Sequence, residues 1–190
     1  MNRFSAVIVG LSILAVGCGD SSSPTAPPQG STTTSTFTVP LSSANEVPAI
    51  TNADAGGSGT AIIALTVTRD DGGNITSATG NVQISVAGFP AGTSVTDAHI
   101  HNGSAGSNAG IYVSAGLASG DLALTNGSGS VAKNGINVPA DRAAAILSNP
   151  AGHYFNVHTT LNPDGAIRGQ LAAGAAGGAV TVEPGTPIPY

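Results

Sequence analysis

All four histidines of this chain of 190 residues lie in two short segments, residues 97–101 and 152–159. Imidazole nitrogens bind zinc and copper, and two imidazoles separated by one residue on a strand point to the same face, about 6.5 to 7 Å apart. His99 and His101 have this spacing. His158 can join them if the strands that carry the two segments are neighbours. We therefore predict a copper or zinc site formed by His99, His101 and His158.

Two polar residues are expected to contact these ligands on the side away from the metal. Asp97 lies on the same face as His99 and can hold the second ring nitrogen of that histidine. Asn156 shares the face of His158 and is expected to lie beside the ligands. His153, five residues before His158, falls on the opposite face of its strand, so we expect it to serve the structure.

The alternative is that these histidines bind no metal. Two histidines on a strand can be polar side chains on a solvated face, and a buried histidine can donate a hydrogen bond to a carbonyl and hold a loop. The chain has only five Lys and Arg and ten Asp and Glu. The clustering of all four histidines in a chain so poor in ionisable groups favours the metal site.

The elements that must position these residues are predominantly strands. Runs of β-branched and alternating apolar residues bounded by Gly-rich turns predict seven strands, and one short helix follows Pro139 and stops before Asn149 and Pro150. The strands are expected at residues 37–41, 61–68, 75–86, 95–101, 111–114, 152–159 and 166–171, and the helix at 139–147. These elements predict an all-β fold, an antiparallel Greek-key-like β-sandwich or flattened barrel with one short helix.

The two ends of the chain have their own signatures. Residues 1–17 have one positive charge followed by a short apolar run, which is typical of a secretory signal peptide. This run leads into Cys18, the only cysteine, as in a bacterial lipobox, so we expect Cys18 to carry lipid. Residues 19–36 contain no hydrophobic side chain larger than Ala, so residues 18–36 predict a flexible Ser/Thr/Pro tether. Residues 172–190 form a low-complexity C-terminal tail.

Composition excludes several functions. The net charge of −5 cannot supply the positive field that nucleic-acid binding requires. No Gly-x-Ser-x-Gly nucleophile elbow is present, and the lone cysteine is assigned to lipid rather than to catalysis. Low charge with abundant Gly, Ala, Ser and Thr is typical of exported β-proteins. We expect a bacterial cell-envelope protein anchored to a membrane through Cys18, facing the periplasm or the exterior, with a protein partner that the sequence does not identify.

Four separate motifs carry a resemblance to a known family. They are residues 41–48, LSSANEVP, residues 98–103, AHIHNG, residues 154–159, YFNVHT, and residues 162–171, NPDGAIRGQL. In order and spacing they resemble the CHRD domain, the module first noticed in chordin, over about residues 41–171, within a β domain expected to span residues 37–171. Ala166 stands where an acidic residue is more usual. The resemblance implies an exported protein, in bacteria often a single-domain envelope protein.

A looser similarity concerns function. A His-x-His strand in a Gly-rich β-fold, followed by a late histidine, is similar to copper–zinc superoxide dismutases. The chain lacks the closely spaced histidines of their zinc loop and their disulfide. We therefore expect a metal-binding protein rather than an enzyme. The alternatives are a metal-free interaction or adhesion module of the envelope and a dismutase-like redox enzyme.

One basic residue is singled out near the end of the domain. Arg168 is expected to form a buried or half-buried ion pair with Glu46 and Asp164 that pins the first and last strands together. The alternative is that Arg168 guides a small anion toward the metal.

Overall fold

Three long strands with alternating burial form the larger part of the sheet. In β1 (Ser31–Ser42), β2 (Ser58–Arg69) and β3 (Ile75–Ala87), buried apolar residues alternate with more exposed positions. The pairing is antiparallel, and Phe37 and Val82 both stand opposite Ile63. Because side chains alternate across a strand, this register puts the apolar residues of all three strands on one face. That face forms one side of the hydrophobic core.

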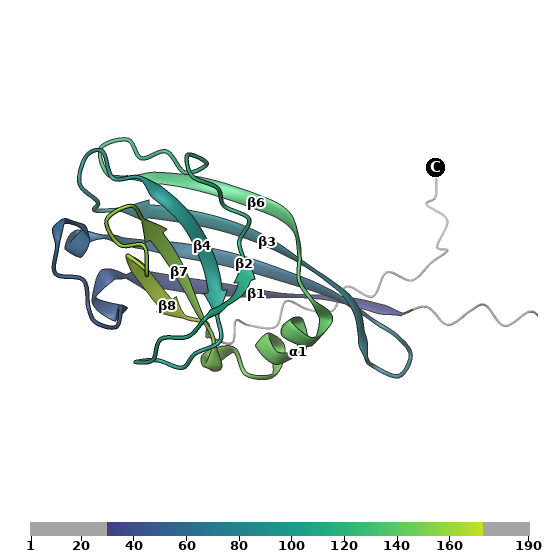
Figure 1. The fold of residues 1–190 in the computed structure, drawn as a ribbon. Helices are drawn as coiled ribbons and strands as arrows, with labels where there is room; N and C mark the ends of the chain where they lie inside the picture. The colour runs from purple at the N-terminus through teal and green to yellow at the C-terminus, as the bar shows by residue number, and fades with distance from the viewer. Residues whose placement is uncertain (1–29, 173–190) are drawn as a thin grey trace, which may run out of the picture.

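A single computed structural model describes residues 30–172, and its strands join in one eight-stranded antiparallel sheet. The remaining strands are β4 (Val95–His101), β5 (Ile111–Ser114), β6 (Gly129–Asn137), β7 (Tyr154–Thr159) and β8 (Ile167–Gln170). The strand order is β5-β4-β7-β8-β1-β2-β3-β6. The sheet curls into a nearly closed flattened barrel, in which the short strands β4, β7 and β8 cross in front of the long ones (Figure 1). The predicted all-β fold is confirmed.

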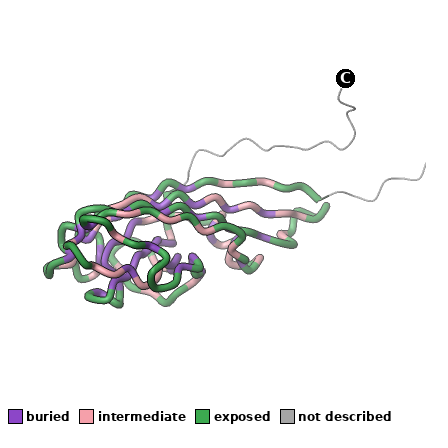
Figure 2. Tube along the Cα trace, turned by 90° about the horizontal axis from the view of Figure 1, so that it is seen from above, coloured by how far each residue is buried: buried purple, intermediate pink, exposed green. Residues whose placement is uncertain are grey.

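The core lies between these two groups of strands. Ile100, Phe155 and Ile167 project from β4, β7 and β8 into the core, and Phe155 and Ile167 have no exposed surface. The β8–β1 junction rests on one paired position, Ser42 with Arg168. Seen from above, the long strands continue beyond the part that the short strands cover (Figure 2).

The helix α1 (Ala140–Ser148) begins after Pro139, and Asp141 in its first turn suits the positive end of the helix dipole. Its buried residues Ala143 and Ile146 face the core, and the helix packs against β3. It is the single α-helix among residues 30–172. Three short 3-10 helices occur at Ser43–Asn45, Ala53–Gly56 and Pro150–Gly152.

Two expectations about the elements were wrong. Residues 31–36, assigned to the flexible tether, belong to β1, because their backbone pairs with β2 and Thr34 bonds Thr66 through their hydroxyl groups at 2.8 Å. The strand β6 was not predicted at all. It lies at the edge of the sheet, and its residues are half-buried or exposed, so its sequence shows little apolar alternation.

The predicted signal peptide, Cys18 and most of the tether lie outside the described residues, as does the C-terminal tail after residue 172. Within residues 30–172, no helix is long and apolar enough to cross a membrane.

Candidate metal centre

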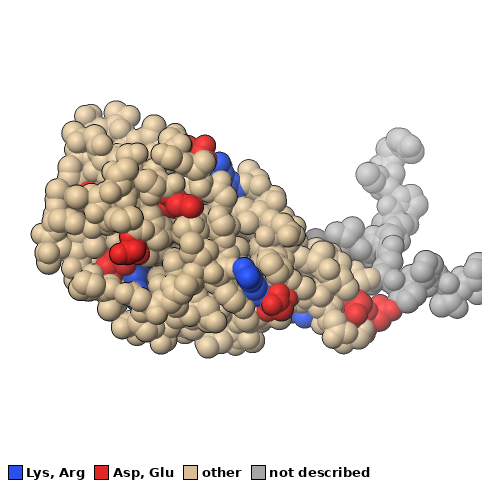
Figure 3. Space-filling model, in the orientation of Figure 1, with Lys and Arg blue, Asp and Glu red and all other residues tan. Residues whose placement is uncertain are grey.

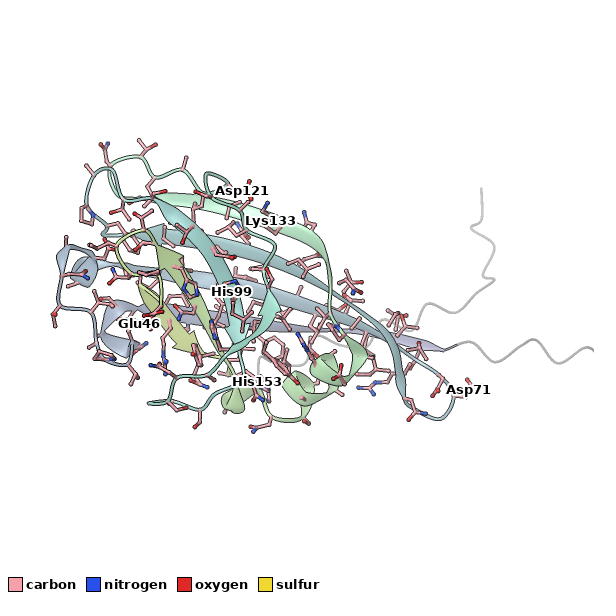
Figure 4. All side chains as sticks on the ribbon, in the orientation of Figure 1. Glu46, Asp71, His99, Asp121, Lys133 and His153 are labelled. Carbon is pink, nitrogen blue, oxygen red and sulfur yellow. The ribbon has the colours of Figure 1, made fainter. Side chains whose placement is uncertain are left out.

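The register between β4 and β7 decides which side chains share a face. Asp97 stands opposite His158, and His99 stands opposite Asn156. Tyr154 faces His101 in the same register. Because these positions alternate with the core residues of both strands, their side chains lie on the face turned away from the hydrophobic core. Figure 4 shows the labelled His99 among the short strands.

The structure brings His99, His101 and His158 together. One nitrogen from each imidazole lies within 4.8 Å of the others, and all three residues are buried. The closest pair is His99 Nδ1 and His158 Nε2, at 3.1 Å. The ring centroids of His99 and His101 are 5.7 Å apart, and those of His101 and His158 are 5.9 Å apart. The three rings therefore converge on a common point.

The other nitrogen of each ring is held by an acceptor. Nδ1 of His101 donates to the carbonyl of Ala109 at 2.9 Å, and Nδ1 of His158 donates to the carbonyl of Pro163 at 2.9 Å. A carbonyl oxygen only accepts, so both Nδ1 atoms carry hydrogen. Nε2 of His99 lies 2.9 Å from a carboxylate oxygen of Asp97. In the neutral rings, the three nitrogens that face one another therefore all carry lone pairs.

Such an arrangement needs a cation or a proton. Nε2 of His101 is buried and has no hydrogen-bond partner. Two lone pairs at 3.1 Å repel each other unless His99 takes up a proton or a metal ion lies between the rings. Burial lowers the pKa of His99 and of His101, and the neighbouring His158 lowers both further, while Asp97 acts in the opposite direction on His99. Protonation is thus disfavoured, and the neutral rings suit a metal ion.

The two expected supporting residues behave differently. Asp97 contacts His99 directly, and its side chain is 38% exposed. Asn156 is fully buried opposite His99, and its amide is packed against Gly165. The side-chain oxygen of Asn156 is buried without a donor. Asn156 thus adds a second unpaired acceptor to the face that carries the histidines.

His153 lies apart from the three converging histidines. Its Nδ1 donates to the carbonyl of Asn149 at 3.0 Å, and its ring lies against Tyr112 at a centroid distance of 5.2 Å. Figure 4 places the labelled His153 away from His99, toward α1.

The predicted ion pair at Arg168 is not formed. Neither Glu46 nor Asp164 comes within 4.0 Å of the Arg168 guanidinium, although all three residues are described. Arg168 instead donates to Asn108 at 3.0 Å and lies 4.1 Å from the centre of the Tyr154 ring. Asp164 is exposed in its turn. Burial raises the pKa of Glu46 to about 7, and the positive charge of Arg168 opposes this rise.

The contacts that hold the loops around the histidines were not predicted from the sequence. Tyr154 stacks on His101 with a centroid distance of 4.7 Å, and its hydroxyl accepts from the backbone N–H of Ala109. The carboxylate of Asp54 accepts from Thr159 and from Asn162, each at 2.7 Å, which fixes the start of the turn that contains Pro163. Backbone carbonyls leave no sequence signal. Asp54 lies more than one hundred residues from its partners, so no local pattern reveals it.

The fold and this site define an all-β protein with a buried three-histidine cluster on one outer face of its sheet. The chain belongs to the CHRD domain family, whose model matches residues 37–171. This match confirms the interpretation drawn from the four sequence motifs. No curated protein and no solved structure matches the chain.

Proposed function

We propose that this CHRD-domain protein is exported, anchored by lipid on Cys18, and binds one copper or zinc ion through His99, His101 and His158. The observation that supports metal binding is the position of the ring hydrogens in the three imidazoles. Each ring gives one nitrogen to an acceptor, at Asp97, Ala109 or Pro163. Each therefore offers its remaining lone pair to the same point.

The distances fit one ion after small side-chain rotations. Ligand nitrogens at about 2.0 to 2.1 Å from a tetrahedral ion stand roughly 3.3 Å apart. The His99–His158 pair is already at 3.1 Å, and one nitrogen from each of the three rings lies within 4.8 Å of the other two. Imidazoles suit both copper and zinc, and the described residues add no thiolate that would select between them.

Three protein ligands leave one coordination position for water or another small ligand. Among the described residues, no further His, Cys, Asp or Glu joins the cluster. This opening favours a second candidate, in which the bound copper performs redox chemistry similar to that of superoxide dismutases. Metal sequestration or delivery needs only the three histidines and is the simpler function. A metal-free envelope module is the remaining possibility if no ion binds.

Export and anchoring are supported by the sequence alone. The apolar run before Cys18 and the small residues that lead into it are typical of a lipoprotein signal. Attachment of lipid to Cys18 also accounts for a lone cysteine in an exported chain.

Elemental analysis of the purified protein tests the metal directly. We expect close to one equivalent of copper or zinc after dialysis, and loss of that metal in the double variant His99→Ala/His101→Ala. His153→Ala is the matched control, since His153 is also buried and bonded to a carbonyl. Equal metal contents in the wild type and the double variant would refute the site. A superoxide assay of the metal-loaded protein then decides whether the ion is redox-active.

A further inference from the structure

Two strands of the sheet have a neighbour on one side only. β5 and β6 stand at opposite ends of the strand order, and neither pairs with a second strand within residues 30–172. A groove of about 610 Å³ lies between them, and its lining includes Val113 of β5 and Lys133, Asn134 and Ile136 of β6. The outer edge of such a strand presents backbone N–H and C=O groups to which a further strand can bond.

The inner wall of the groove is apolar and adjoins the hydrophobic core. Val113, Ala115 and Ile136 line both the groove and a cavity of about 20 Å³ inside the barrel, which Phe37 and Phe155 also border. Val113 and Ala115 are buried, and Ile136 is half-buried. Because the side chains of a strand alternate, an added strand directs every second residue toward this wall. The groove therefore fits a segment in which apolar residues alternate with polar ones.

The described part of the chain ends close to this groove. The backbone N–H of Leu171, just after β8, donates to the carbonyl of His153 at 2.9 Å. The ring of His153 lies 5.2 Å from that of Tyr112 in β5. Arg142, which lines the groove, has its guanidinium 5.2 Å from the centre of the same Tyr112 ring. A short series of contacts thus leads from the end of β8 to the groove.

The sequence after residue 172 contains one segment with the required pattern. Residues 180–183 are Val-Thr-Val-Glu, and the first three of them are β-branched. On a strand, Val180 and Val182 fall on one face, and Thr181 and Glu183 fall on the other. A Gly-Gly pair precedes the segment and a Pro-Gly pair follows it, as turn residues bound a strand.

We propose that residues 180–183 lie in this groove as an added strand along the outer edge of β6, with Val180 and Val182 directed toward the inner wall. Residues 173–179 are all Gly or Ala and form the connection. An extended chain from residue 172 to residue 180 spans up to roughly 26 to 29 Å. Four strand spacings from β8 to a strand beyond β5 amount to about 19 Å, so the connection is long enough.

The charges of the groove and of the segment are complementary. Lys133 and Arg142 are the charged residues that line the groove, and both are basic. Lys133 is paired with Asp121, whereas Arg142 has no carboxylate within 4.0 Å among the described residues. Glu183 is the single charged residue of 173–190. Few charged side chains appear on the face shown in Figure 3, so an acidic residue finds few basic neighbours elsewhere on that face.

Hydrogen exchange of the full chain tests the added strand. In the wild type we expect slow exchange of backbone N–H groups along β6 and in residues 180–183, because the two strands share hydrogen bonds. Val182→Asp places a carboxylate against the apolar wall, so it should release the segment and speed exchange at both places. Thr181→Asp, the matched control, adds the same charge on the opposite face and should keep exchange slow. Equal exchange in the wild type and Val182→Asp, or equal loss of protection in both variants, would overturn the proposal.

A cross-link shows which molecule supplies the segment. Asn134 is exposed and lines the groove, so a protein with Cys18→Ser, Asn134→Cys and Thr186→Cys carries one thiol at the groove and one just after the segment. A short bis-maleimide should join them within one molecule, at a yield independent of protein concentration. Thr38→Cys in place of Asn134→Cys is the control, since Thr38 is exposed on β1, away from the groove. Links formed only between molecules, or no more often than in the control, would contradict the proposal.

Discussion

Nδ1 of His99 lies 3.1 Å from Nε2 of His158, and in the neutral rings both nitrogens carry lone pairs. This contact is a consequence of the β4–β7 register, which puts the two histidines on one face, and of the acceptors that hold their opposite nitrogens. A cation between the rings relieves the repulsion. We therefore expect this contact to change when the proposed metal ion is removed.

Replacing the carboxylate behind His99 should weaken metal binding. In Asp97→Asn the amide can present its N–H groups to Nε2 of His99. The ring hydrogen of His99 is then no longer favoured on Nε2. We expect metal affinity to fall about 10- to 100-fold. Asp97 is partly exposed, so stability should change little. Competition with a chromogenic chelator measures the affinity, and unchanged affinity would contradict the orienting role. Asp121→Asn, at a similarly exposed aspartate, is the control.

Removing the buried charge of Asp54 should loosen the turn that holds His158. Asp54 is 1% exposed and accepts from Thr159 and Asn162. Hydrogen bonds to a charged group contribute about 1.5 to 3 kcal/mol each and those between neutral groups about 0.5 to 1.5 kcal/mol each. Asp54→Asn can keep both bonds on its amide oxygen but makes them neutral, so it should lower the free energy of unfolding by roughly 2 to 3 kcal/mol. Urea unfolding measures this loss. The exposed Asp71→Asn should have no such effect, and equal losses in the two variants would contradict the assignment.

Glu46 should make stability depend on pH. Its pKa is about 7 in the folded protein and near 4.5 in the unfolded chain, so the folded state binds more protons between these values. Its contribution to the free energy of unfolding should therefore fall as pH rises from 4.5 to 7, by up to roughly 3 kcal/mol. The lowered pKa values of His99 and His101 give the opposite slope.

The difference between the wild type and Glu46→Gln isolates the contribution of this carboxyl group. Urea unfolding of both proteins at several pH values gives that difference directly. We expect the wild type to lose stability relative to the variant as pH rises toward 7. Parallel pH profiles for the two proteins would show that Glu46 ionises normally in the folded state.

Membrane attachment should depend on Cys18. When the full chain is expressed in a bacterium, the wild-type protein is expected in the membrane fraction, and Cys18→Ser should be released from it because no lipid can be attached. Fractionation followed by immunoblotting measures the distribution. Ser21→Ala, a nearby change that keeps the cysteine, is the control. Membrane association that persists in Cys18→Ser would refute the lipid anchor.

Periodicity predicted the parts of the site that depend on strand alternation. The spacing of His99 and His101, and the shared face of Asn156 and His158, follow from alternation within single strands. Sequence alone left open whether the two strands are neighbours, and the antiparallel pairing of β4 with β7 supplies that relationship. The acceptors at Ala109 and Pro163 are backbone atoms in loops, so no residue type indicates them.

The errors have related causes. Residues 31–36 lack large apolar side chains, and only their pairing with β2 orders them as a strand. Arg168 was assigned an ion pair from the charges available in the sequence, but Tyr154 and Asn108 occupy the positions around its guanidinium. Both cases depend on long-range contacts, which composition and local pattern do not contain.

Anomalous diffraction from crystals grown with copper or zinc, recorded at the absorption edge of that metal, tests the central claim most directly. We predict one strong peak about 2.0 to 2.1 Å from His99 Nδ1, His101 Nε2 and His158 Nε2, with Asp97, Ala109 and Pro163 still holding the opposite nitrogens. A peak at His153 or on the surface, with the three converging histidines unchanged and no density between them, would contradict the account.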